Sequence, residues 1–156
     1  MKGTSFFRMI SSPIFLSAFF SWFTAQLIKL IINVLRRRIR SSKSAVTSLF
    51  WATGGMPSSH SAAVAALATS VGFTVGIDSP LFVTILVFGL IVVRDALGVR
   101  RAAGHQARAL NNLGRELSNR FNVQYRSVKE INGHNFSEVS VGILLGFFIA
   151  TAFCNL

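Results

Sequence analysis

The chain has 156 residues, of which 51% are hydrophobic, and phenylalanine alone occurs 15 times. Lysine and arginine nonetheless outnumber aspartate and glutamate by 16 to 5, which gives a formal net charge of +11. Soluble domains seldom combine these two features, and a nucleic-acid-binding protein of this charge has no need of long uncharged apolar runs. The composition therefore predicts a small integral membrane protein and argues against a nucleic-acid partner.

Four apolar stretches could cross the hydrocarbon core, which takes about 20 residues of helix. They are residues 13–35, 61–77, 81–93 with a continuation toward 99, and 139–153. The second and fourth are short, so we expect their ends in a polar vestibule within the bundle. We predict an all-α fold, with residues 1–156 forming a single membrane-embedded domain of about four transmembrane helices. Gly72 with Gly76, and Gly142 with Gly146, are spaced for close contacts between these helices.

Basic residues concentrate in two connections, the one after the first stretch and the one between the third and fourth. They are Arg36, Arg37, Arg38, Arg40 and Lys43, then Arg94, Arg100, Arg101, Arg108, Arg115, Arg120, Arg126 and Lys129. Connections rich in lysine and arginine stay in the cytoplasm. The expected location is a bacterial inner membrane, with both termini facing outward.

The second basic connection also contains a helical pattern. Its apolar residues are Ala103, Ala107, Leu110, Leu113, Leu117 and Phe121, and its polar ones include Arg101, His105, Arg108, Asn112 and Arg115. This spacing predicts a basic amphipathic helix. One interpretation places it in the membrane interface, with anionic lipid headgroups as partners. The other is a solvated helix packed on the bundle.

Ionisable residues near the predicted cytoplasmic ends of the spans indicate a convergent site, because such residues are costly at membrane depth. They are Lys29, Arg36, His60, Arg94, Asp95, Arg100, Arg101, His134 and Glu138. The chain offers no His/Cys set typical of a metal site, so we expect neither metal nor cofactor.

The segment Pro57-Ser58-Ser59-His60 opens the second stretch with polar groups. A serine there can cap the helix, and the free N–H groups of the first turn can hold an anion. His60 could donate a proton to a leaving oxygen, since imidazole titrates near neutral pH. The alternative is a purely structural cap, with His60 bonded to a neighbouring carbonyl. Lys29 and Arg36 lie two helical turns apart and can face one point.

His134 and Glu138 lie four residues apart, on one face of a helix that begins early enough. A carboxylate that binds one ring nitrogen leaves the other free to attack an electrophile. The competing interpretation is a capping box, with Asn135 as the cap and Glu138 at the third helical position. Asp95 is expected to pair structurally with a nearby arginine, while Arg100 or Arg101 is the candidate for binding phosphate.

The order Lys29-x6-Arg36, Pro57-Ser58-Ser59-His60, His134-x3-Glu138 resembles the three-part signature of the type-2 phosphatidic acid phosphatase and vanadium haloperoxidase superfamily. The strings "GGMPSSHSA" and "DALGVRRAAG" look like its small divergent branch, over residues 26–146. The resemblance implies that His134 attacks phosphorus, an acid at Glu138 orients it, and His60 protonates the leaving group. Lys29, Arg36, Ser58 and Ser59 would then hold the phosphate oxygens.

This chain departs from the family pattern at four positions. Arg37, Ser59 and Glu138 stand where the superfamily usually has proline, glycine and aspartate, and Val128 stands where it has an arginine. Arg100, Arg101, Arg126 and Lys129 are the candidates to replace that arginine.

The predicted function is hydrolysis of a phosphomonoester or diphosphate on a lipid or isoprenoid through a phosphohistidine, at a site facing the cytoplasm. Side-chain cations would neutralise the transition state in place of a metal. The expected partners are the lipid phosphate and further copies of the chain. Two alternatives are a non-catalytic binder or transporter of phosphorylated lipid, and a structural protein whose basic face recruits anionic lipid or another protein.

Overall fold

The computed structural model describes residues 2–36, 55–130 and 133–156. Within these ranges every regular element is a helix, which confirms the predicted all-α class. The helices are α1 (Lys2–Ile10), α2 (Pro13–Leu35), α4 (Ser59–Thr74), α5 (Pro80–Arg94), the π-helical turn η1 (Asp95–Val99), α6 (Arg100–Phe121) and α7 (Phe136–Asn155). Four residues of the first basic connection, Arg37, Arg38, Arg40 and Lys43, lie outside the described residues.

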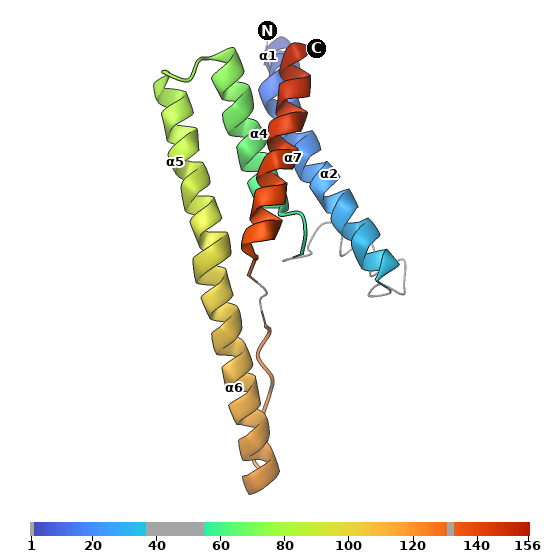
Figure 1. The fold of residues 1–156 in the computed structure, drawn as a ribbon, viewed down its shortest axis with the longest axis vertical. Coiled ribbons are helices and arrows are strands. Elements are labelled where there is room, and N and C mark those ends of the chain that lie inside the picture. The colour runs from blue at the N-terminus through green and yellow to red at the C-terminus, as the bar shows by residue number, and fades with distance from the viewer. Residues whose placement is uncertain (1, 37–54, 131–132) are drawn as a thin grey trace.

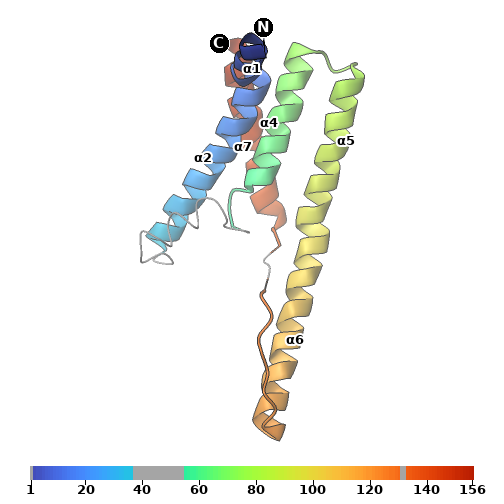
Figure 2. The ribbon, with the colours of Figure 1, turned by 180° about the vertical axis from the view of Figure 1, so that it is seen from behind.

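Three helices pack against one another to form the bundle. α4 contacts both α2 and α7, α2 contacts α7, and α5 adds to the open side of α4 (Figure 1). The two termini and the turn between α4 and α5 lie at one end, and the beginnings of α4 and α7 lie at the other, in both views (Figure 2). This arrangement puts Arg36, which follows α2, at the end of the bundle from which α6 and its basic residues extend (Figure 1).

Length and composition qualify three helices as membrane spans. They are Pro13–Leu35, the continuous helix Pro80–Phe121, and Phe136–Asn155. α4 has 16 residues, short of the length of a span, and it lies within the bundle between α5 and α7 (Figure 1). The protein is thus a helical membrane protein in which three described helices qualify as spans, against the four or so predicted. The second apolar stretch is short, as expected, whereas the fourth, also expected to be short, forms the 20-residue α7.

Small residues form the core of this bundle. Ala62, Ala66 and Ala150 are fully buried, as are Ser17 and Ser21. Helices without large side chains at their contact can approach closely, which is how helices associate in membranes.

The closest approach is between α4 and α7. A Cβ atom on Gly142 would collide with the carbonyl oxygen of Ser58, and one on Gly146 with that of Ala62. The expected role of this glycine pair is confirmed. For Gly76 the expectation is wrong, because this residue lies in the turn after α4 at a φ of 105°, a conformation that favours glycine.

α6 continues α5 as one helix of 42 residues, and it projects beyond the end of the bundle (Figure 1). The turn η1 keeps the helix unbroken, since the N–H of Arg100 bonds the carbonyl of Asp95. At 1.5 Å per residue the helix is about 63 Å long, roughly twice the hydrocarbon thickness. The amphipathic helix therefore stands away from the bundle, whereas a helix in the membrane interface would have to turn at η1.

Residues 122–130 return along α6 toward the bundle (Figure 1). Asn111, which is buried, holds this segment: its amide donates to the carbonyl of Val128 at 3.0 Å and to Glu130 Oε1 at 2.9 Å. Its oxygen accepts from the Val128 N–H at 2.9 Å and from the Tyr125 hydroxyl. The chain is thereby guided back to His134 and the start of α7.

Candidate functional site

The side chains of His134 and Glu138 meet at the start of α7. Nδ1 of His134 lies 2.9 Å from Oε2 of Glu138, and His134 is 7% exposed. The carboxylate can only accept, so in the neutral ring Nδ1 carries the hydrogen and Nε2 keeps its lone pair. This is the tautomer that a nucleophilic histidine requires.

The same carboxylate also caps α7. The backbone N–H of Asn135 donates to Glu138 Oε2 at 3.2 Å, and a full capping box is present. One side chain therefore makes both the contact with His134 and the capping box, and the orientation of the His134 ring is tied to the first turn of α7.

The backbone of His134 is anchored on the long helix. Its N–H donates to the carbonyl of Ala96 at 3.1 Å, and Ala96 lies in the π-helical turn. Gly133 abuts the backbone of Arg101 so closely that a Cβ atom there would collide with it. Local π-helical geometry is frequent at functional sites, and here it sets where His134 enters the bundle.

The segment Pro57-Ser58-Ser59-His60 opens α4 with a serine cap. Ser58 Oγ accepts the Ser61 N–H at 3.4 Å and the Ser61 hydroxyl at 3.0 Å, and the Ser58 N–H donates to the carbonyl of Glu138 at 2.9 Å. Ser58 and Ser59 are buried. The cap interpretation is confirmed for Ser58, and the structure brings this segment against the first turn of α7.

His60 lies exposed on the first turn of α4. Arg100, Lys29 and His134 are near enough for their charges to act on its ring. The structure therefore brings His60 and His134 close enough for their charges to interact.

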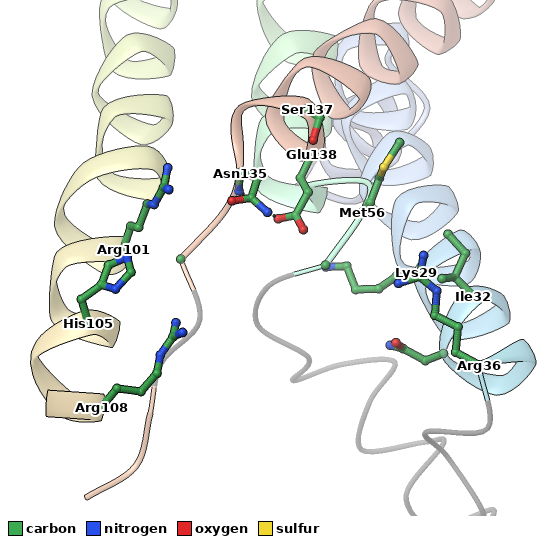
Figure 3. Close-up of a pocket in the computed structure, with 13 residues that line it drawn as sticks. Lys29, Ile32, Arg36, Met56, Arg101, His105, Arg108, Asn135, Ser137 and Glu138 are labelled. Atoms are coloured by element: carbon green, nitrogen blue, oxygen red, sulfur yellow. Dashed lines mark hydrogen bonds between the residues drawn. The ribbon is translucent and has the colours of Figure 1, made fainter. Parts of the chain in front are cut away.

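Glu138, the partner of His134, lines a cavity of about 530 Å³ (Figure 3). Lys29, Ile32 and Arg36 of α2 form one wall, and Arg101, His105 and Arg108 of α6 face them from the other (Figure 3). The remaining lining residues are Asn33, Gly55, Met56, Gly133, Asn135, Ser137 and Glu138. Cations on two opposing walls make this cavity suited to a phosphate group.

Of the predicted site residues, Lys29, Arg36, Arg101 and Glu138 line the cavity. The others, Ser58, Ser59, His60, Asp95, Arg100 and His134, are not among its lining residues. Lys29 is only 3% exposed, and Glu138 is the carboxylate whose charge acts on it. A buried ammonium needs such a counter-charge.

Arg100 and Arg101 have different environments. Arg100 Nε lies 2.6 Å from Asp95 Oδ2, in a pair whose side chains are 48% and 40% exposed. The structural interpretation of Asp95 is thus realised with Arg100, in a partly exposed pair. Arg101, one residue further around the helix, faces the cavity, while Arg126 and Lys129 do not line it. Arg101 is therefore the best-placed replacement for the arginine missing at Val128.

Two lining residues, His105 and Arg108, were not singled out as site residues from the sequence. Helical spacing from Arg101 places both on its face, which is the signal that could have found them. Arg108 Nε also lies 3.7 Å from Glu130 Oε2.

Among the described residues no group of three or more His, Cys, Asp or Glu could hold a metal ion. The expectation of a metal-free site stays a prediction.

Apolar spanning helices around a cationic cavity define a helical membrane protein with a site suited to anions. The chain belongs to the divergent PAP2 family, whose family model matches residues 10–149. It is 42% identical over 137 residues to the uncharacterized membrane protein YuiD of Bacillus subtilis (strain 168), covering 80% of this chain and 83% of that relative. No solved structure matches the chain. Membership of the family confirms the resemblance drawn from the three motifs.

Proposed function

We propose that this protein is a membrane phosphohydrolase that removes phosphate from a lipid or isoprenoid phosphate through a phosphohistidine at His134. One observation carries the proposal: Nδ1 of His134 is held by Glu138 at 2.9 Å, at the edge of a cavity with cations on two walls. Glu138 links the two features, because it both orients the histidine and lines the cavity.

In the first step Lys29, Arg36 and Arg101 hold the phosphate oxygens. Nε2 of His134 attacks phosphorus, and the P–O bond to the lipid breaks with its electron pair leaving on oxygen. His60 donates a proton to that oxygen, and Glu138 stabilises the positive charge on the His134 ring. Cations already in place favour the transition state because they need no reorganisation as its charge develops.

In the second step water gives a proton to His60 and attacks phosphorus. The P–N bond breaks, inorganic phosphate is released, and His134 recovers its lone pair. The exposed position of His60 supports this role, since the group must reach both the leaving oxygen and water.

On the predicted topology the cavity lies at the cytoplasmic side of a bacterial inner membrane. Its substrates would then be lipids of the inner leaflet, such as phosphatidate, phosphatidylglycerol phosphate or isoprenyl mono- and diphosphates.

A second candidate function is binding or transport of a phosphorylated lipid without hydrolysis. The observation in its favour is that the cavity is lined by Lys29, Arg36, Arg101 and Arg108 but by neither His60 nor His134. Such a protein would keep the phosphate cradle and need no nucleophile.

Phosphate release by the detergent-purified protein separates the two functions. We expect one substrate of the four lipid phosphates above to be hydrolysed, with inhibition by vanadate. His134→Ala and His60→Ala should each lower the rate by a factor on the order of 10²–10⁴, while Asn119→Ala, an exposed change on α6, should not. If no substrate is hydrolysed while lipid phosphate still binds, the binder is the correct function and the phosphohydrolase is excluded.

A further inference from the structure

One wall of the cavity carries polar side chains that the proposed reaction does not use. This wall consists of Arg101, His105 and Arg108 of α6, and the reaction uses only Arg101. The three residues occupy positions i, i+4 and i+7 of one helix, which places them within about 60° of one another around its axis. We call them the α6 row.

Two members of the α6 row differ from nearby arginines in having no partner among the described residues. Arg100 pairs with Asp95 at 2.6 Å, and Arg115 bonds two residues of its own helix. Within the described ranges no hydrogen bond or ion pair involves Arg101 or His105. The N–H donors of these two side chains are therefore available to a ligand in the cavity.

Arg108 is held at the cavity by the segment that returns along α6. Its Nε lies 3.7 Å from Oε2 of Glu130, and Oε1 of the same carboxylate accepts from the buried Asn111 at 2.9 Å. Because both members of the ion pair are partly exposed, the pair contributes little stability by itself. It engages the Nε side of the guanidinium, which leaves the terminal N–H groups for a ligand.

The cavity has room for more than one phosphate group. Its volume of about 530 Å³ compares with about 30 Å³ for one water molecule. Arg101 and Arg108 are about 10.5 Å apart along the helix axis, and Figure 3 shows the ends of their side chains well separated. Hydrogen bonds from arginine to phosphate are only about 2.7–2.9 Å long. A phosphate held by Lys29, Arg36 and Arg101 therefore leaves the rest of the α6 row unused.

We propose that His105 and Arg108 form a second phosphate site, next to the one at which a lipid phosphate is attacked. Its ligand is a phosphate group, supplied either by a lipid headgroup that carries two phosphates or by inorganic phosphate. The guanidinium fork of Arg108 suits this ligand, because arginine binds phosphate oxygens in pairs. The inference rests on the proposed function for the identity of the first ligand, but it does not require hydrolysis.

Titration of inorganic phosphate tests the second of these sources. The full-length His134→Ala protein, which cannot form the phosphohistidine, is first saturated with short-chain phosphatidate in detergent. We expect inorganic phosphate to bind beside the lipid, in isothermal titration. Arg108→Gln should weaken this binding by about tenfold or more, and His105→Gln by about threefold or more.

Arg120→Gln is the matched control, because it removes the same charge from an exposed position of the same helix. Arg120 lies about 18 Å beyond Arg108 along the axis, outside the range of about 10 Å over which charges act at ordinary salt concentrations. Its replacement should leave phosphate affinity within about twofold of the unsubstituted value.

Farnesyl monophosphate and farnesyl diphosphate test the headgroup as the source. Both are titrated into the His134→Ala protein without phosphatidate. If the headgroup supplies the second phosphate, we expect the diphosphate to bind about tenfold more tightly than the monophosphate. Arg108→Gln should then remove this preference and leave the affinity for the monophosphate unchanged.

The second site is supported, and its source identified, by the expected result of either titration. The proposal is overturned if inorganic phosphate only competes with phosphatidate while the diphosphate binds no better than the monophosphate, because the cavity then holds one phosphate. Equal losses in Arg108→Gln and Arg120→Gln would also overturn it, since net charge alone would explain them. Phosphate release by the unsubstituted protein tests the phosphohydrolase separately, so either idea can fail without the other.

Discussion

The carboxylate of Glu138 accepts two hydrogen bonds through one oxygen, from the ring of His134 and from the backbone of Asn135. One residue therefore caps α7 and sets the tautomer of the proposed nucleophile. Because both bonds start from the same helical turn, the ring has little freedom to move independently of α7.

Replacing Glu138 by glutamine separates the two roles. The glutamine oxygen can still accept the Asn135 N–H, since glutamine also completes a capping box, but it lacks the charge that stabilises a positive His134 ring. We expect Glu138→Gln to lower kcat by a factor on the order of 10²–10⁴, and to lower the melting temperature only because the buried Lys29 loses its counter-charge.

Glu138→Ala is the matched comparison. This variant also loses the cap, so it should be about 1 kcal/mol less stable than Glu138→Gln, with a similar loss of activity. Phosphate release and thermal unfolding in detergent measure the two effects. Unchanged kcat in Glu138→Gln would show that the carboxylate acts only as a cap.

At the scale of helices, the packing of α4 on α7 brings the motifs together. Gly142 and Gly146 let the α7 backbone approach the carbonyls of Ser58 and Ala62. The N–H of Ser58 then reaches the carbonyl of Glu138 at 2.9 Å. The serine segment and the His134–Glu138 pair, about 80 residues apart in sequence, become neighbours by this contact.

Gly146→Ala should disturb this packing. Its Cβ would meet backbone atoms of α4, which cannot move aside as a side chain can. We expect a loss of about 1–3 kcal/mol of stability, seen as a lower melting temperature. Gly98→Ala is the control, because nothing lies within 4 Å of its Cβ position, and it should not lower the melting temperature, since alanine favours a helix more than glycine does. Equal melting temperatures for the two variants would contradict the close approach.

At the scale of the whole molecule, the two ends differ in charge. The termini and the turn around Asp78 occupy one end, and the cationic cavity and α6 lie toward the other (Figures 1 and 3). From this asymmetry we expect a single orientation in the membrane, with the cavity facing the cytoplasm.

Reporter fusions at the C-terminus test this orientation in a bacterial host. We expect alkaline phosphatase fused after Leu156 to be active and green fluorescent protein at the same place to be dark, because both report an outward C-terminus. A fusion of each reporter after Phe121, at the end of α6, should give the opposite pattern. Reversal of both results would move the cavity to the outer face.

Local patterns in the sequence determined the helical class, the apolar stretches and the four-residue spacing that allows His134 to meet Glu138. Each of these depends on residues within one or two helical turns, where periodicity and side-chain chemistry are sufficient. The spacing of Lys29 and Arg36 predicted only that both can face one point, and their phosphate-binding role came from the family resemblance.

Only the tertiary structure decided which residues share the cavity. Arg101 faces it while Arg100 pairs with Asp95, and His105 and Arg108 join it because α6 continues straight from α5 and lies opposite α2. Ser58 is buried because α7 packs against its backbone, and Ser59 is buried next to it. These outcomes depend on contacts between helices far apart in the chain, and the packing of distant backbones has no signature in local spacing.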